Sequence, residues 1–348
     1  MLTFDVAMPL TLFLVTLAAL VLSKRVENKL KTNFEEREFR TRDAILLVVL
    51  VSVAVSVVVF VPELAILAVF LFSYGALLFT FSFFFSGLKR RSAQVFFVGI
   101  GLAGLAAGAV ALLGIYGNGL VMFYGGLAAS GLATCAFIAA LYEQVRVAEA
   151  KSRWYLAVMP PVLFLVVYFL FMFKPIPLVS LVLLDASGVV FAVLITLYLS
   201  SLFSWKSVFV FAALLTVMDI ILVLFTGVMV TAATHVAGLG LPVLISLPTV
   251  PLMMTAEGIR FLALGLGDFF FAGTLATQTY KKYGRRVAIV SAVTMTVSFA
   301  AFETVLLSTE FGAFPGTLMI IIGWVPVVAW KMVSERKTKN SVVVESKV

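Results

Sequence analysis

Residues 264–269 read Leu264-Gly265-Leu266-Gly267-Asp268-Phe269, in the middle of an otherwise apolar stretch. We expect this stretch to cross a membrane, where a buried carboxylate costs roughly 3 kcal/mol or more. Asp268 therefore needs either a compensating structure or a functional role. The two glycines before it remove side-chain bulk, so another helix can approach the carboxyl group closely.

A second carboxylate lies in the preceding span, in Leu215-Thr216-Val217-Met218-Asp219-Ile220. Asp219 lies about twelve residues into its span and Asp268 about eleven into the next. With a rise of about 1.5 Å per residue, we expect both near the middle of the membrane, facing each other from antiparallel helices. Two adjacent carboxylates hold one proton between them, so one can act as a base towards water and the other as an acid towards a peptide carbonyl. The sequence does not assign these two roles.

The composition indicates a polytopic α-helical membrane protein. Of its 348 residues, 63% are hydrophobic and 12% are charged, and long apolar runs recur from end to end. The alternating pattern of an outer-membrane barrel is absent. A single cysteine, Cys135, and a single histidine, His235, argue against a metal centre built on these residue types, and we expect no cofactor.

We expect an all-α fold with about nine to eleven transmembrane helices. The apolar spans run approximately over residues 4–23, 44–62, 64–87, 94–115, 119–142, 154–173, 177–203, 207–230, 257–279, 287–307 and 315–331. Gly101, Gly104 and Gly108 offer a small face for helix packing. We divide the chain into N-terminal scaffold helices (1–203), a catalytic bundle in the C-terminal half (204–331) and a disordered cytoplasmic tail (332–348).

Basic residues gather in alternate loops, which predicts the orientation in the membrane. They lie in segments 24–43, 89–91, 146–153, 206, 281–286 and 336–347. By the positive-inside rule, the N-terminus is outside and the C-terminus is cytoplasmic. The net charge of +8 is explained by these loops, and we expect no nucleic-acid partner. Compact loops favour the plasma membrane of a prokaryote.

The sequence resembles the presenilin and signal peptide peptidase family of intramembrane aspartyl proteases. The resemblance is carried by an aspartate in one span, Gly265-Leu266-Gly267-Asp268 in the next, and a proline that opens the last span, over roughly residues 205–331. It implies that Asp219 and Asp268 are the catalytic pair, that no metal or cofactor is needed, and that the substrates are transmembrane helices. Family members typically have nine spans, so any two extra spans are expected near the N-terminus.

The resemblance also implies where the substrate is bound. The family's Pro-Ala-Leu motif falls on Pro315-Gly316-Thr317, where only the proline is retained and Leu318 stands one position late. Met218 replaces the tyrosine that usually precedes the first aspartate. The expected substrate-binding residues are Gly265, Leu266, Gly267, Pro315, Gly316, Thr317 and Leu318.

The expected orientation resembles that of signal peptide peptidases rather than presenilins. It implies substrates with a cytoplasmic N-terminus, such as signal-peptide remnants or type II anchors. The loop over 231–256 contains Leu241-Pro242-Val243-Leu244-Ile245-Ser246-Leu247-Pro248, an apolar run between two prolines. It can lie extended and capture an unwound substrate by strand addition, or it can pack as a re-entrant loop.

Other functions use similar residues. A transporter or channel could use Asp219 and Asp268 as proton or cation ligands. A prepilin-type peptidase also uses an aspartate and a Gly-x-Gly-Asp, but it has fewer spans and its acids lie at the membrane edge, whereas here they are expected at mid-span. A non-catalytic chaperone for membrane helices is a further alternative. The substrate, its cleavage site and the oligomeric state do not follow from the sequence.

Overall fold

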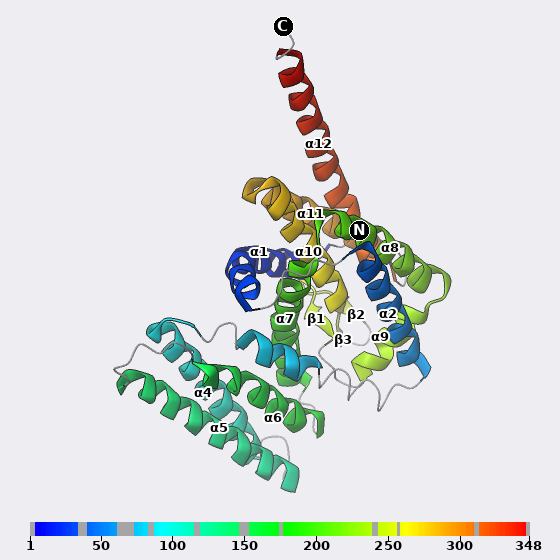
Figure 1. Cartoon of the computed structure of the whole chain (residues 1–348). Helices are drawn as coiled ribbons and strands as arrows, with labels where there is room; N and C mark the ends of the chain where they lie inside the picture. Colours follow the sequence, from blue (N-terminus) through cyan, green and yellow to red (C-terminus); the bar gives the residue numbers. More distant parts are fainter. Residues whose placement is uncertain are drawn as a thin grey trace. The chain divides into compact units, whose positions relative to one another are not determined.

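The computed structural model describes the whole chain except residues 1–3, 34–39, 61–72, 83–86, 115–118, 146–152, 174–176, 239–242, 256–257, 310–312 and 346–348. Within this part, six helices are long and apolar enough to cross a membrane, and helices dominate the chain (Figure 1). The expected all-α polytopic class is thus confirmed. Much of the expected span 64–87 lies outside the described residues.

The chain forms two compact units, one of residues 63–187 and one that joins residues 1–62 to 188–348. The first unit contains α4 (Arg90–Leu112), α5 (Leu120–Val145), a short 3-10 helix (Trp154–Ala157) and α6 (Met159–Phe173). Its helices α4 and α5 pack through the predicted small face. A Cβ at Gly104 would lie 3.0 Å from the Ala129 carbonyl oxygen, and one at Gly108 would lie 2.4 Å from Ser130 Oγ.

The second unit contains the residues of the expected site. Its helices are α1 (Ala7–Asn33), α2 (Thr41–Phe60), the later part of α7 (Pro177–Leu202), α8 (Trp205–Ile220), α9 (Val228–Gly238), α10 (Leu266–Tyr283), α11 (Arg285–Ser308) and α12 (Gly316–Glu345). Four short strands lie between α9 and α10: β1 (Leu244–Pro248), β2 (Met254–Thr255), β3 (Gly258–Ile259) and β4 (Phe261–Gly265).

Helix α10 is the centre of this unit, and α1, α8, α11 and α12 pack against it (Figure 1). Nearly all of its side chains from Phe269 to Thr279 are buried. Gln278 Nε2 donates to the carbonyl oxygens of Ser200 and Phe203, each at 2.8 Å, and so fixes α10 to the end of α7. Trp324 Nε1 of α12 donates to Thr279 Oγ1 at 2.9 Å. Buried polar bonds of this kind fix the register of α10 against its neighbours.

The stretch before Asp268 is a strand, which corrects the expectation of one continuous helical span over 257–279. Strand β4 pairs antiparallel with β1, from Leu244 opposite Gly265 to Pro248 opposite Phe261. Helix α10 begins only at Leu266. The apolar run Phe261–Leu264 has no helical or strand periodicity of its own, so the tertiary partner β1 decides its conformation.

Two further boundaries differ from the sequence-based expectation. Residues expected in the loop after 230 continue as helix α9 to Gly238. The expected disordered tail after 331 is instead helical, because α12 continues to Glu345. Its polar segment 334–340 is rich in lysine, glutamate and arginine and lacks glycine and proline, so nothing in it breaks a helix.

The N-terminal segment is tied to the turn that follows β1. Val6 N–H donates to the Val250 carbonyl at 2.9 Å, and Val250 N–H donates to Asp5 Oδ1 at 2.6 Å. The other oxygen, Asp5 Oδ2, accepts from Met8 N–H at 2.9 Å and caps α1. We call these three bonds the Asp5 clamp. It holds the β1–β4 hairpin against the start of α1.

Candidate active site

Asp219 lies in the last turn of α8, which corrects the expectation that it sits in the middle of a regular helix. The α8 helix begins with a capping box, in which the Ser204 hydroxyl accepts from Ser207 N–H. It ends at Ile220 and passes into a π-helical turn, Ile221–Phe225. Such turns are frequent at functional sites because they widen the helix and redirect its side chains. The Asp219 carboxyl is half-buried and points to the start of α12.

Asp268 lies in the first turn of α10, rather than eleven residues into a helix. Gly265 ends β4 and is also the N-cap of α10, in an extended conformation. Asp268 Oδ2 lies close to Gly265, 3.4 Å from the position that a Cβ on this residue would take. Asp268 therefore follows three residues after the end of the β1–β4 hairpin. The N-terminus of α10 favours a negative charge at this position.

The two carboxyl groups converge on adjacent residues at the start of α12. Thr317 donates to Asp219 Oδ2 twice, from its hydroxyl at 2.6 Å and from its backbone N–H at 3.2 Å. A Cβ built on Gly316 would lie 2.5 Å from Asp268 Oδ1 and 2.7 Å from its Cγ. Three elements thus bring the two aspartates together: α8, the β4–α10 junction and the first turn of α12.

The other expected site residues occupy different places around this pair. Gly267 is exposed, and a Cβ there would meet nothing within 4 Å. Leu266 is 6% exposed, and its N–H donates to the Val243 carbonyl at 3.0 Å. Pro315 is buried just before α12, and Leu318 is half-buried in its first turn. These positions surround the pair, and their contact with a substrate stays a prediction.

Sequence reasoning missed two features of this region. The first is the double bond from Thr317 to Asp219, for which the only signal is a hydroxyl residue in place of the family's leucine. The second is the Asp5 clamp. An aspartate three residues before Met8, just ahead of an apolar helix, is the pattern of a helix N-cap and would have indicated half of it.

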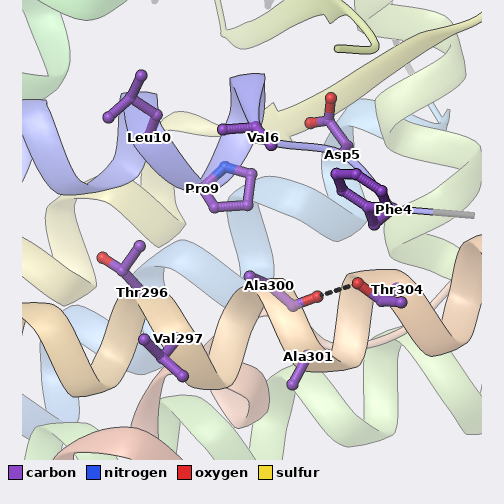
Figure 2. Close-up of a pocket in the computed structure, with 10 residues that line it drawn as sticks. All are labelled: Phe4, Asp5, Val6, Pro9, Leu10, Thr296, Val297, Ala300, Ala301 and Thr304. Carbon is purple, nitrogen blue, oxygen red and sulfur yellow. Dashed lines mark hydrogen bonds between the residues drawn. The ribbon is translucent and has the colours of Figure 1, made fainter. Parts of the chain in front are cut away.

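An open groove lies elsewhere in the same unit, between the start of α1 and α11 (Figure 2). Its volume is about 510 Å³. It is lined by Phe4, Asp5, Val6, Pro9, Leu10, Thr296, Val297, Ala300, Ala301 and Thr304. Both Asp5 oxygens are bonded to backbone N–H groups, and Thr304 bonds to its own helix at the Ala300 carbonyl. None of the expected site residues lines the groove, and its chemistry is that of an apolar helix surface.

The described residues include no group of three or more histidine, cysteine, aspartate or glutamate side chains that could hold a metal ion. The pair itself consists of two carboxyl groups with the Thr317 hydroxyl and backbone N–H beside them. Two carboxyls held together in this way can transfer protons to and from a water molecule and an amide.

Comparison with known proteins identifies the family of the chain. No curated protein matches the chain. The family model of signal peptide peptidase matches residues 29–313, a range that contains both aspartates and the β1–β4 hairpin. Since this match spans most of the sequence, the chain is a multi-pass membrane protein that belongs to the signal peptide peptidase family.

Proposed function

We propose that the protein is an intramembrane aspartyl endopeptidase that cleaves peptide bonds within transmembrane segments. The observation that carries the proposal is the convergence of Asp219 and Asp268, from two different helices, on the first two residues of α12. Membership in a peptidase family supports it. The alternative of an ion-coupled transporter uses the same carboxylates but has no support from the family match.

The proposed reaction is hydrolysis with one proton held by the pair. The ionised carboxylate takes a proton from water as the water oxygen bonds to the peptide carbon. The protonated carboxyl gives its proton to the carbonyl oxygen, and a tetrahedral diol forms. When the carbon–nitrogen bond breaks, the pair supplies a proton to the leaving nitrogen and recovers one from the diol. No metal or cofactor is required for these steps.

The substrate has to be extended at the bond that is cut, because the carbonyl groups of a helix are already hydrogen-bonded. Strand β4 offers a template for this. Its ladder with β1 is flanked by the bonds from Leu266 N–H to the Val243 carbonyl and from Thr249 N–H to the Arg260 carbonyl. Since hydrogen-bonded pairs alternate in an antiparallel ladder, the backbone groups of Phe261 and Ala263 point away from β1.

We infer that the substrate adds a strand along this outer edge of β4. Phe261 and Ala263 are exposed, and within the described part of the chain β4 pairs only with β1. A substrate strand bonded to Phe261 and Ala263 leads to Asp268 within a few residues. Strand addition supplies affinity through main-chain bonds, which suits an enzyme that accepts varied apolar sequences.

The distribution of basic residues among the loops supports a proposal for the orientation of the substrate. With residues 89–91 and 281–286 on the cytoplasmic side, the N-terminus lies outside and α12 ends in the cytoplasm. Substrates in this orientation have a cytoplasmic N-terminus, as signal-peptide remnants and type II anchors do. We propose a prokaryotic plasma membrane as the location because the loops of the chain are compact.

The test uses purified full-length protein in lipid with a fluorogenic transmembrane peptide. We expect wild type to cleave it, Asp219→Ala and Asp268→Ala each to lower the rate by at least a thousandfold, and a hydroxyl-containing transition-state analogue to inhibit. A wild type that cleaves no member of a broad peptide panel and binds no analogue would refute the proposal. Ion flux that depends on both aspartates would then support the transporter.

A further inference from the structure

Thr317 holds Asp219 through two bonds to one oxygen. It is the second residue of α12 and is 4% exposed. Its hydroxyl lies 2.6 Å and its backbone nitrogen 3.2 Å from Asp219 Oδ2. An N–H in the first turn of a helix has no partner within that helix. Asp219 therefore caps α12 from a different helix, as an N-cap side chain would do from within the chain.

The two aspartates differ in their hydrogen-bond donors. Asp219 lies in the last turn of α8 and accepts from the Thr317 N–H at the start of α12, whereas Asp268 lies in the first turn of α10. Of the two aspartates, Asp219 is the one that accepts from a side-chain hydroxyl within the described part of the chain. Donors aimed at a carboxylate favour its ionised form, and bonds to a charged acceptor are stronger than neutral ones. The Thr317 hydroxyl therefore tips the shared proton towards Asp268.

We propose that Thr317 is a positioning residue that holds Asp219 as the water-activating base and leaves Asp268 as the proton donor. The inference rests on the proposed peptidase function and gives each aspartate a role within it. It also differs from the role that the family motif predicts for Thr317, which is binding of the substrate. Its hydroxyl is directed at the catalytic carboxylate, whereas the motif predicts contact with the substrate.

The experiment measures kcat and KM for Thr317→Val and Thr317→Ser in the full-length enzyme. Valine keeps the shape of threonine but removes the hydroxyl, so we expect kcat to fall about ten- to a hundredfold with KM unchanged. Serine keeps the donor, so we expect kcat within about threefold of wild type. Thr304→Val is the matched control, because its hydroxyl bonds only to the Ala300 carbonyl of its own helix; we expect no change.

Each other result contradicts the proposal. An unchanged kcat in Thr317→Val would show that the hydroxyl does not act on Asp219. A raised KM with normal kcat would make Thr317 a substrate contact. If Thr317→Val is active and Thr317→Ser is not, the shape of the side chain matters and its hydroxyl does not. Thr317 would then act through packing. Thermal unfolding shows whether Thr317→Val is folded. If it is not, kcat and KM are measured for Thr317→Ala instead.

The failure of this inference differs from the failure of the proposed function. If wild type cleaves and the two aspartate variants do not, the peptidase is established, whatever Thr317→Val does. If wild type does not cleave and binds no transition-state analogue, the peptidase itself is refuted. The Thr317 variants are compared only against an active wild type.

Discussion

At Gly316 a carboxyl group occupies the space where a side chain would begin. The first turn of α12 can approach Asp268 only because this residue has no Cβ. The family pattern has alanine here, so this chain holds its second aspartate closer to α12 than a chain with alanine could in the same arrangement. The glycine is therefore part of the site's geometry.

We expect Gly316→Ala to lower kcat about tenfold or more while the protein remains folded. The new Cβ would lie 2.5 Å from Asp268 Oδ1, and the flexible carboxyl can move away more easily than the backbone. The measurement is peptide cleavage together with thermal unfolding. Gly131→Ala in α5 is the control, because a Cβ there meets nothing within 4 Å. Normal kcat in Gly316→Ala would show that the carboxyl is placed elsewhere during catalysis.

Asp219 is expected to contribute to stability as well as to catalysis, because it caps α12. Asp219→Ala removes the acceptor of Thr317 N–H and should destabilise the fold by about 1 kcal/mol. Asp219→Asn keeps an oxygen acceptor and should unfold near the wild-type temperature, although both variants lose cleavage. Thermal unfolding in one detergent compares the three proteins. Equal stability of the alanine and asparagine variants would argue against the cap.

The sequence was sufficient to predict that Asp219 and Asp268 lie close together. It was not sufficient to predict the hydrogen bonds that hold this region in place. A lone acid in an apolar run is conspicuous because burying it is costly. Thr317 and Asp5 form their bonds with residues 98 and 245 positions away. No local pattern encodes such partners, since they depend on how the helices pack.

At the scale of elements, the hairpin β1–β4 decides where α10 begins. Its paired edge bonds to β1, and its outer edge carries Phe261 and Ala263. Pro248 of β1 lies opposite Phe261, at a pair without mutual backbone bonds, so its missing N–H costs the ladder nothing. The outer edge of β4 is the edge along which we propose that a substrate strand adds.

We expect Ala263→Pro and Leu262→Pro to act differently. Proline at 263 removes an N–H from the outer edge and should raise KM or abolish cleavage with little loss of stability. Proline at 262 removes an N–H that faces Leu247 of β1, so it should lower the unfolding temperature as well. Cleavage and thermal unfolding separate the two effects. Full activity of Ala263→Pro would exclude strand addition at this edge.

Helices were easier to predict than the strands between them. Long apolar runs predict α4, α5 and α11 because their length alone excludes a strand. Residues 261–264 are also apolar and run directly into α10, so the sequence alone predicts a single span over 257–279. The apolar run between Pro242 and Pro248 is compatible with an extended segment or a re-entrant loop, and the structure forms strand β1 there. Its partner β4 could not be identified without the tertiary fold.

At the scale of the whole molecule, orientation in the membrane stays a prediction that labelling can test. We expect Lys89→Cys to react with an impermeant thiol reagent only from the cytoplasmic side and Leu252→Cys only from outside. Both positions are exposed. Since Cys135 is also exposed, both are introduced into a Cys135→Ser background. Labelling of the two sites from reversed sides would imply substrates of the opposite orientation.

The Asp5 clamp has a consequence for how the protein is made. The first helix leaves the ribosome early, but Asp5 and Val6 find their partner only after residue 250 has been synthesised. Until then the Asp5 carboxylate has only its bond within α1, and the hairpin that leads to Asp268 has not formed. A chain halted before that point carries neither the hairpin nor the second aspartate. The candidate site can therefore assemble only after residue 268 has been synthesised, late in the making of the chain.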